Sequence, residues 1–77
     1  MKHEDVHWVR NDLELENGQS LKVQARIRYR QALSSALLCR KDRGYFLLFD
    51  TAQRGITPGQ FAAWYIEDEL IGSGVIS

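Results

Sequence analysis

Six basic residues and no acidic residue lie between Gln19 and Lys41, and this basic segment offers the clearest candidates for chemistry in the sequence: Lys22, Arg26, Arg28, Arg30, Arg40 and Lys41. Side chains at alternate positions of a β-strand leave the same face about 6.5–7 Å apart, because each residue rises about 3.3 Å. Successive phosphates of one nucleic-acid strand have a similar spacing, so the alternating arginines indicate a surface that binds a nucleic-acid backbone. A solvated strand face whose arginines pair with carboxylates on neighbouring strands would show the same pattern.

The total charge of the sequence gives no support to nucleic-acid binding. The 77 residues include ten Lys and Arg and ten Asp and Glu, a formal net charge of zero. A domain that binds nucleic acid through its overall charge is basic as a whole. Here eight of the ten acids lie away from the basic segment, five in residues 1–16 and three in Glu67-Asp68-Glu69. Nucleic-acid binding can therefore be argued only from how the charges are distributed along the sequence, and not from the net charge.

Alternation of apolar and polar residues with a period of two predicts β-strands. The pattern is clearest over Leu21–Arg30, where apolar and mainly basic residues strictly alternate. Turn-forming residues separate the candidate strands, and Pro58-Gly59 has the residue types of a type II turn. The other expected strands are Asp5–Val9, Ser34–Lys41, Tyr45–Phe49, Phe61–Ile66 and Leu70–Ile76, with turns at 41–44, 57–60 and 67–69 and a polar connection over 11–20.

Six short strands in one small domain, residues 1–77, predict an all-β fold, a small closed antiparallel β-barrel of about six strands. A two-sheet sandwich is the alternative, and the barrel is favoured because closure removes exposed sheet edges. Gly72 and Gly74 share one face of the last strand, where we expect a neighbouring backbone or a bulky ring to approach closely.

Catalysis and metal binding find little support in the residue types. The single cysteine, Cys39, rules out an internal disulfide and a zinc site of several cysteines, and we expect a half-buried structural thiol. His3 and His7 are four residues apart, a spacing that brings two metal ligands together only on a helix. Because this segment is expected to be extended, we expect solvated histidines and predict no metal site. Among the aromatic residues, Tyr29 is the best candidate for stacking on a base, because it lies among the arginines. The other tyrosines and the tryptophans are expected mainly in the core.

No apolar run approaches the roughly 20 residues that span a bilayer. The first residues contain no apolar stretch of the kind that a secretory signal needs. A cytoplasmic location without membrane contact is therefore expected.

Several motifs occur in the order found in a known family. They are His7-Trp8, Gln24-Ala25-Arg26-Ile27-Arg28-Tyr29-Arg30-Gln31, Phe49-Asp50, Gln53-Arg54, Thr57-Pro58-Gly59-Gln60 and Gly72-Ser73-Gly74-Val75-Ile76. From about Val6 to Ile76 the chain thus resembles the C-terminal domain of the bacterial tRNA-specific 2-thiouridylases, which install sulfur at the wobble uridine. Two positions depart from the family pattern: Ala52 stands where many members have proline, and Ser73 interrupts a glycine triplet.

The resemblance implies a non-catalytic tRNA-docking module of a larger ATP-dependent enzyme. In that family a PP-loop catalytic domain and a small central domain precede the C-terminal β-barrel, and they contain the ATP site and both catalytic cysteines. No cofactor is therefore expected in this chain. The expected partners are tRNA, the catalytic and central domains of the same polypeptide and, for the whole enzyme, sulfur-donor proteins. The positions that match tRNA contacts of the family are Arg28, Tyr29 and Gln60. Arg26 and Arg30 are weaker candidates, because only their positive charge supports a contact with tRNA.

Strict alternation would place Arg28 and Tyr29 on opposite faces of one strand. Both can contact one tRNA only if the strand ends or bulges there, so we predict an irregularity between Tyr29 and Ala32. The alternative function is an intramolecular scaffold or protein-interaction β-barrel that makes no direct RNA contact and holds its arginines in salt bridges. An independent enzyme has the least support, since no nucleophile and base can be paired in the sequence.

Overall fold

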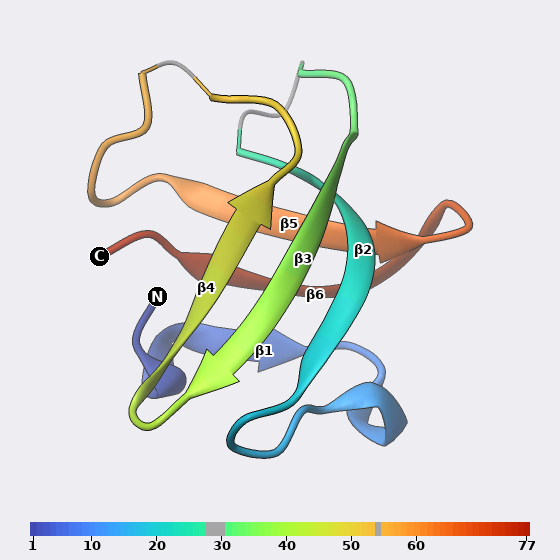
Figure 1. The fold of residues 1–77 in the computed structure, drawn as a ribbon, viewed down its shortest axis with the longest axis vertical. Helices are drawn as coiled ribbons and strands as arrows, with labels where there is room; N and C mark the ends of the chain where they lie inside the picture. Colours follow the sequence, from blue (N-terminus) through green and yellow to red (C-terminus); the bar gives the residue numbers. More distant parts are fainter. Residues whose placement is uncertain (28–30, 54) are drawn as a thin grey trace.

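The computed structural model describes residues 1–27, 31–53 and 55–77. They form a single six-stranded sheet in which every neighbouring pair of strands is antiparallel, so the all-β prediction is confirmed. The strands follow the order β1-β6-β5-β2-β3-β4 across the sheet (Figure 1). Their bounds are β1 (Val6–Trp8), β2 (Ser20–Arg26), β3 (Ser34–Lys41), β4 (Gly44–Phe49), β5 (Phe61–Ile66) and β6 (Glu69–Val75), with short 3-10 helices η1 (His3–Asp5) and η2 (Asn11–Leu13).

The closed barrel that the sequence predicts is not confirmed. Strands β1 and β4 are the two ends of the sheet, and no ladder joins them within the described residues. The segment before β1 bridges part of this gap, since the Met1 ammonium donates to the Tyr45 carbonyl at 2.9 Å and Tyr45 N–H to the Met1 carbonyl at 2.8 Å. Strand β1 is only three residues long and pairs with β6 over its whole length. Within the described residues its other edge forms no ladder with β4.

Strand bounds differ from the predictions mainly at the ends of the elements. The first strand is shorter than Asp5–Val9, because the 3-10 helix η1 includes Asp5 and β1 ends at Trp8. The last strand ends at Val75 instead of Ile76. The strand predicted over Leu21–Arg30 is β2, which ends at Arg26. Ile27, the next described residue, lies in a bend. Arg28, Tyr29 and Arg30 lie outside the described residues, and so does half of the span from Tyr29 to Ala32 in which an irregularity was predicted.

The predicted turns are present between the strands. Gly59 has φ +92°, which the third position of a type II turn requires. Glu67 and Asp68 connect β5 to β6 with φ values of 51° and 66°, as in the type I′ turns that match the twist of two-residue hairpins. The hairpin between β3 and β4 turns through Asp42, whose φ is 50°.

The core lies between β2, β3 and β4 on one side and β1, β5 and β6 on the other (Figure 1). Three aromatic side chains of this core contact one another: Trp8 meets Trp64 edge-on with ring centroids 5.7 Å apart, and the Trp8 Nε1 donates to the Tyr45 hydroxyl at 3.3 Å. Strand β2 contributes Val23 and Ala25 to this core, which leaves its polar residues on the outside. Within the described ranges no helix is long and apolar enough to cross a bilayer.

Candidate nucleic-acid interface

Arg26, the last residue of β2, lies against Tyr65 of β5 on the outer face of the sheet. Its Nη2 donates to the Tyr65 hydroxyl at 2.9 Å, and its Cζ lies 5.3 Å from the centroid of the tyrosine ring. The strand register explains this contact, because Gln24 is opposite Tyr65 and Arg26 is opposite Ala63. Arg26 and Tyr65 are thus diagonal neighbours on one face. The contact holds a long side chain in a fixed position and limits the entropy that binding would cost.

Arg26 and Tyr65 also line a shallow groove of about 300 Å³. Ala63 and Ser73 are direct partners in the ladder between β5 and β6, and their small side chains leave room between the larger residues. The other lining residues are Ile27, Phe61 and Leu70. Aromatic and aliphatic surface beside a guanidinium suits a base or ribose next to a phosphate.

Phe61 is the most exposed of the groove residues that sequence reasoning missed, with 67% of its surface exposed. The segment Phe61–Ile66 is apolar at every position, so alternation gives no polar face to mark the outside. Only the packing of Ala62 and Trp64, both fully buried, places Phe61 and Tyr65 on the outer face. The one feature of the sequence that could have pointed to Phe61 as a site residue is its position directly after the Pro58-Gly59-Gln60 turn.

Gln60 closes that turn with its own side chain. Thr57 N–H donates to Gln60 Oε1 at 2.8 Å, and the Gln60 carbonyl accepts from Ile76 N–H at 2.8 Å. A further hydrogen bond, from Gly59 N–H to the Ile76 carbonyl, fastens the turn to the end of the chain. The Gln60 Nε2 donates to none of the described residues, which leaves it available for a phosphate or ribose oxygen.

Two further glutamines of the family motifs join the end of β2 to the loop after β4. Ile27 N–H donates to Gln31 Oε1 at 3.0 Å, and Gln31 Nε2 donates to Gln53 Oε1. Gln53 Nε2 donates in turn to the Thr51 carbonyl at 3.0 Å. These contacts fix the residues on both sides of positions 28–30. Arg28, Tyr29 and Arg30 themselves lie outside the described residues, so their approach to Gln60 remains a prediction.

The remaining members of the basic segment divide between the surface and the interior. Lys22 and Lys41 are exposed on the outer face. Arg40 turns inward, where its Nη1 donates to the Leu15 carbonyl at 2.6 Å and its Cζ lies 5.7 Å from the Tyr45 ring centroid. Arg40 is therefore part of the fold and is not available to a nucleic acid.

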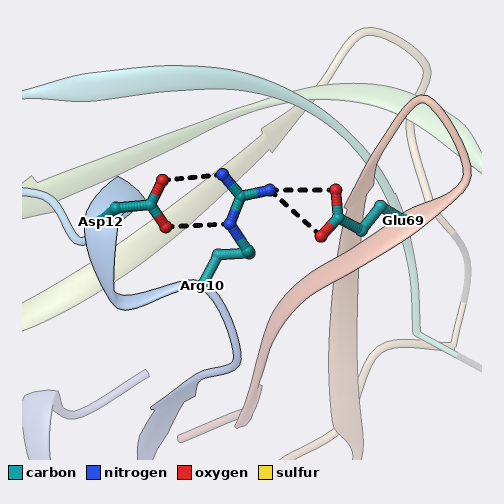
Figure 2. A network of polar contacts seen from close by, with 3 residues as sticks. All are labelled: Arg10, Asp12 and Glu69. Atoms are coloured by element: carbon teal, nitrogen blue, oxygen red, sulfur yellow. Dashed lines mark hydrogen bonds and ion pairs between the residues drawn. The ribbon is translucent and has the colours of Figure 1, made fainter.

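Both ion pairs between described residues belong to Arg10, which lies outside the basic segment (Figure 2). The Arg10 guanidinium makes two hydrogen bonds to Asp12, at 2.7 and 2.9 Å, and two to Glu69, at 3.0 and 3.1 Å. The hydrogen bonds from Arg10 lower the pKa of Asp12. This network ties η2 to the start of β6, so two of the acids serve the fold. Lys22, Arg40 and Lys41 pair with no carboxylate in the described part of the chain.

The other candidates for chemistry have structural surroundings. His3 stacks on Tyr45 with ring centroids 5.9 Å apart, and Cys39 is half-buried on β3, as expected. No group of three or more His, Cys, Asp or Glu side chains in the described ranges is placed to hold a metal ion. The predicted core positions of Trp8, Tyr45 and Trp64 are confirmed. The expected core position of Tyr65 is wrong, because Tyr65 alternates with the buried Ala62 and Trp64 and lies half-buried on the outer face.

A small antiparallel β domain with an arginine and aromatic outer face is the class that these observations define. Residues 1–76 match the family described as the aminomethyltransferase beta-barrel domain, and the chain belongs to that family. It is 56% identical over 73 residues to the tRNA-specific 2-thiouridylase MnmA of Flavobacterium johnsoniae and 51% identical over 74 residues to that of Christiangramia forsetii. The Karelsulcia muelleri protein of the same name is 38% identical over 77 residues.

These alignments cover 95%, 96% and 100% of this chain but only 18%, 19% and 20% of the three relatives. The chain therefore spans about one fifth of the length of the curated relatives it matches. The resemblance to the C-terminal domain of the tRNA-specific 2-thiouridylases is confirmed over the whole chain.

Proposed function

We propose that this chain is the tRNA-docking domain of an ATP-dependent tRNA-specific 2-thiouridylase and is non-catalytic by itself. The observation that carries the proposal is the identity of 56% over 73 residues to a protein named for that activity. Two structural features support it. The outer face presents Arg26 held by Tyr65, and the neighbouring turn presents the Gln60 amide. The ladder places Arg26 opposite Ala63, three residues after Gln60, so these features lie at the same end of β5.

In this proposal Arg28 neutralises a backbone phosphate, and Tyr29 stacks on a base or donates its hydroxyl proton. Gln60 donates from Nε2 to a sugar or phosphate oxygen, while its Oε1 keeps the turn closed. Arg26 and Arg30 add positive charge beside these contacts. Contacts of this kind position an RNA without reading its sequence. Selection of the uridine therefore belongs to another part of the enzyme.

The ATP site and the catalytic cysteines are proposed to lie in the remaining four fifths of the polypeptide, together with the contacts to sulfur-donor proteins. Gly72-Ser73-Gly74 does not have the surroundings of a phosphate-binding loop. It lies inside strand β6, and the Trp64 ring covers Gly72. Cys39 lines the surface of β3 and is assigned no catalytic role.

The test compares tRNA binding by the full thiouridylase polypeptide and its variants over a range of salt concentrations. Arg28→Ala is expected to weaken binding by roughly tenfold and to lower the salt slope by about 0.7–0.9, the effect of one lost phosphate contact. Arg43→Ala, which removes an exposed arginine in the turn between β3 and β4, is the control and should leave both quantities unchanged.

A second variant separates RNA contact from folding. Gln60→Glu keeps an oxygen that accepts from Thr57 N–H but replaces the Nε2 donor with a second oxygen, which repels a phosphate. We expect weaker tRNA binding with an unchanged unfolding midpoint. If both variants leave tRNA affinity unchanged and Arg28→Ala lowers thermal stability, the chain is a scaffold instead and the docking role is wrong.

A further inference from the structure

The central parts of β3 and β4, residues 36–39 and 46–49, pair with each other and are apolar on both faces, unlike β2 beside them. The inner face contributes Ala36, Leu38 and Tyr45 to the core. On the outer face Leu37 lies directly opposite Leu48, and Cys39 lies directly opposite Phe46. These four residues, Leu37, Cys39, Phe46 and Leu48, form what we call the outer patch. Leu48 is 59% exposed and Phe46 is 53% exposed.

The outer patch departs from the rule that antiparallel strands with one solvated face alternate apolar and polar residues. The outer face of β2 follows that rule with exposed Ser20, Lys22 and Gln24. Single exposed apolar side chains are ordinary, but a contiguous cluster marks an interaction surface. A hollow of about 270 Å³ lies between Cys39, Lys41, Phe46 and Leu48, so the patch is also shaped to receive a side chain.

The edge of the sheet next to the patch is a second, independent sign of a missing neighbour. Strand β4 is the last strand in the sheet order, and the N-terminal segment bonds to it only around Gly44 and Tyr45. From Leu47 to Phe49 no other described strand pairs with the outer edge of β4. Proteins usually cover such apolar edges, because exposed ones pair with other chains.

We propose that the outer patch docks against the upstream part of the same thiouridylase polypeptide. The inference rests on the assignment of this chain to a longer thiouridylase, as the proposed function does, but it does not depend on tRNA contact. The relatives supply the occupant, because about four fifths of their length lies outside the region that this chain matches. A covalently linked segment is present at a high effective concentration and covers a modest patch without a large interface.

The position of the patch agrees with two separate roles for the domain. Strands β3 and β4 cross in front of β5 and β6 in Figure 1, and the inner faces of both pairs meet in one core. Their outer faces therefore point in opposite directions. The groove with Arg26 and Tyr65 is left accessible when the outer patch is covered.

Cys39 provides a direct reporter, since it belongs to the patch and is a free thiol. The experiment measures alkylation of Cys39 by N-ethylmaleimide in the full polypeptide, with the Cys39 peptide quantified by mass spectrometry. The variant Phe46→Thr/Leu48→Thr should raise the labelling rate by at least about tenfold, because undocking exposes the thiol. Phe61→Thr, which changes an exposed aromatic position on the opposite face, is the control and should leave the labelling rate unchanged.

The proposal is overturned if Cys39 in the unsubstituted polypeptide is labelled as fast as in the double variant. It is also overturned if protection rises with protein concentration, because a second copy would then cover the patch. Tryptophan emission, to which the buried Trp8 and Trp64 both contribute, reports whether the domain is folded in the double variant, and Leu48→Lys alone repeats the test if it is not. Measuring tRNA binding in the same samples separates the proposals, since Arg28→Ala should weaken binding whether or not Cys39 is protected.

Discussion

The indole ring of Trp64 lies directly on the backbone of Gly72, its partner across the ladder between β5 and β6. A Cβ atom at Gly72 would lie 2.8 Å from Trp64 Nε1 and 2.9 Å from the His7 carbonyl oxygen. On its other side Gly72 pairs with Trp8. A residue without a side chain therefore lies between the two tryptophans and lets their rings meet over it. The close approach that the sequence predicted for this glycine is confirmed.

Replacing Gly72 with alanine should destabilise the domain by about 1–3 kcal/mol, the usual effect of adding a methyl group to a filled core. The added atom meets backbone as well as the ring, so the surroundings cannot yield easily. Urea unfolding followed by tryptophan emission measures the effect. Ser73→Ala is the matched control, because Ser73 faces the outer groove. If the two variants lost the same free energy of unfolding, close packing of Gly72 under Trp64 would not be the cause of the destabilisation.

Arg40 and Lys22 belong to the same basic segment, but we expect opposite behaviour from them. Arg40→Met should lower the free energy of unfolding by about 1–3 kcal/mol, because the Leu15 carbonyl loses a charged hydrogen-bond donor. Lys22→Met removes an exposed charge on β2 and should change stability by less than about 0.5 kcal/mol. Thermal unfolding of Arg40→Met and Lys22→Met measures these two changes in stability. A loss of tRNA affinity in folded Arg40→Met protein would contradict its assignment to the fold.

Tyr65→Phe tests whether the Arg26 position matters for RNA. The substitution removes the hydroxyl that accepts from Arg26 at 2.9 Å and keeps the ring under the guanidinium. Under the proposed function we expect tRNA affinity in the full polypeptide to fall by about two- to fivefold, since a less ordered Arg26 loses more entropy on binding. Tyr45→Phe, which changes a buried hydroxyl in the core, should leave tRNA affinity unchanged. Equal affinities of Tyr65→Phe and the unsubstituted protein would remove the groove from the interface.

Asp12 should make stability depend on pH in the acid range. Its pKa is lowered below the ordinary 3.8 by hydrogen bonds from Arg10, so its carboxylate form is favoured in the folded state. The stabilisation is therefore fully present above pH 3.8 and is lost as the pH falls through the lower folded pKa. Asp12→Asn should lower the urea midpoint at neutral pH, with the difference from the unsubstituted protein shrinking in acid. Because the ion pair between Arg10 and Asp12 is exposed, high salt should also reduce this difference in urea midpoint.

Glu4→Gln serves as the control for this pH dependence, because Glu4 is exposed and forms no ion pair within the described residues. A difference between Asp12→Asn and the unsubstituted protein that stays constant down to the lowest pH would contradict the predicted direction of the pH dependence. It would show that the carboxamide disturbs η2 for a reason other than the lost charge.

The sequence predicted the strands and turns well because each depends on neighbouring residues. Alternation over β2 separates Val23 and Ala25 from Lys22 and Gln24, and the structure keeps that division. The positive φ of Gly59 likewise follows from the local preference of a Pro-Gly pair. The all-β class and the family followed from these elements and from the motifs.

The site was predicted less completely, because its members are distant in sequence. Arg26 and Gln60 were named from charge and from the family motifs, but Phe61 was not, since an entirely apolar strand has no polar face to orient it. Arg40 was counted with the other residues of the basic segment, and in the structure it donates to the carbonyl of Leu15, 25 residues before it in the chain. Alternation cannot separate a basic residue that meets solvent from one that finds a buried carbonyl.

The sequence by itself therefore determined the elements, the turns and the family of this protein, because short-range preferences and motif order are written in consecutive residues. Tertiary structure alone decided how far the sheet closes, which apolar face of β4 enters the core and which arginines remain outside. Those outcomes depend on register and packing between strands that lie far apart in the chain, as when Gln24 opposite Tyr65 brings Arg26 against that ring.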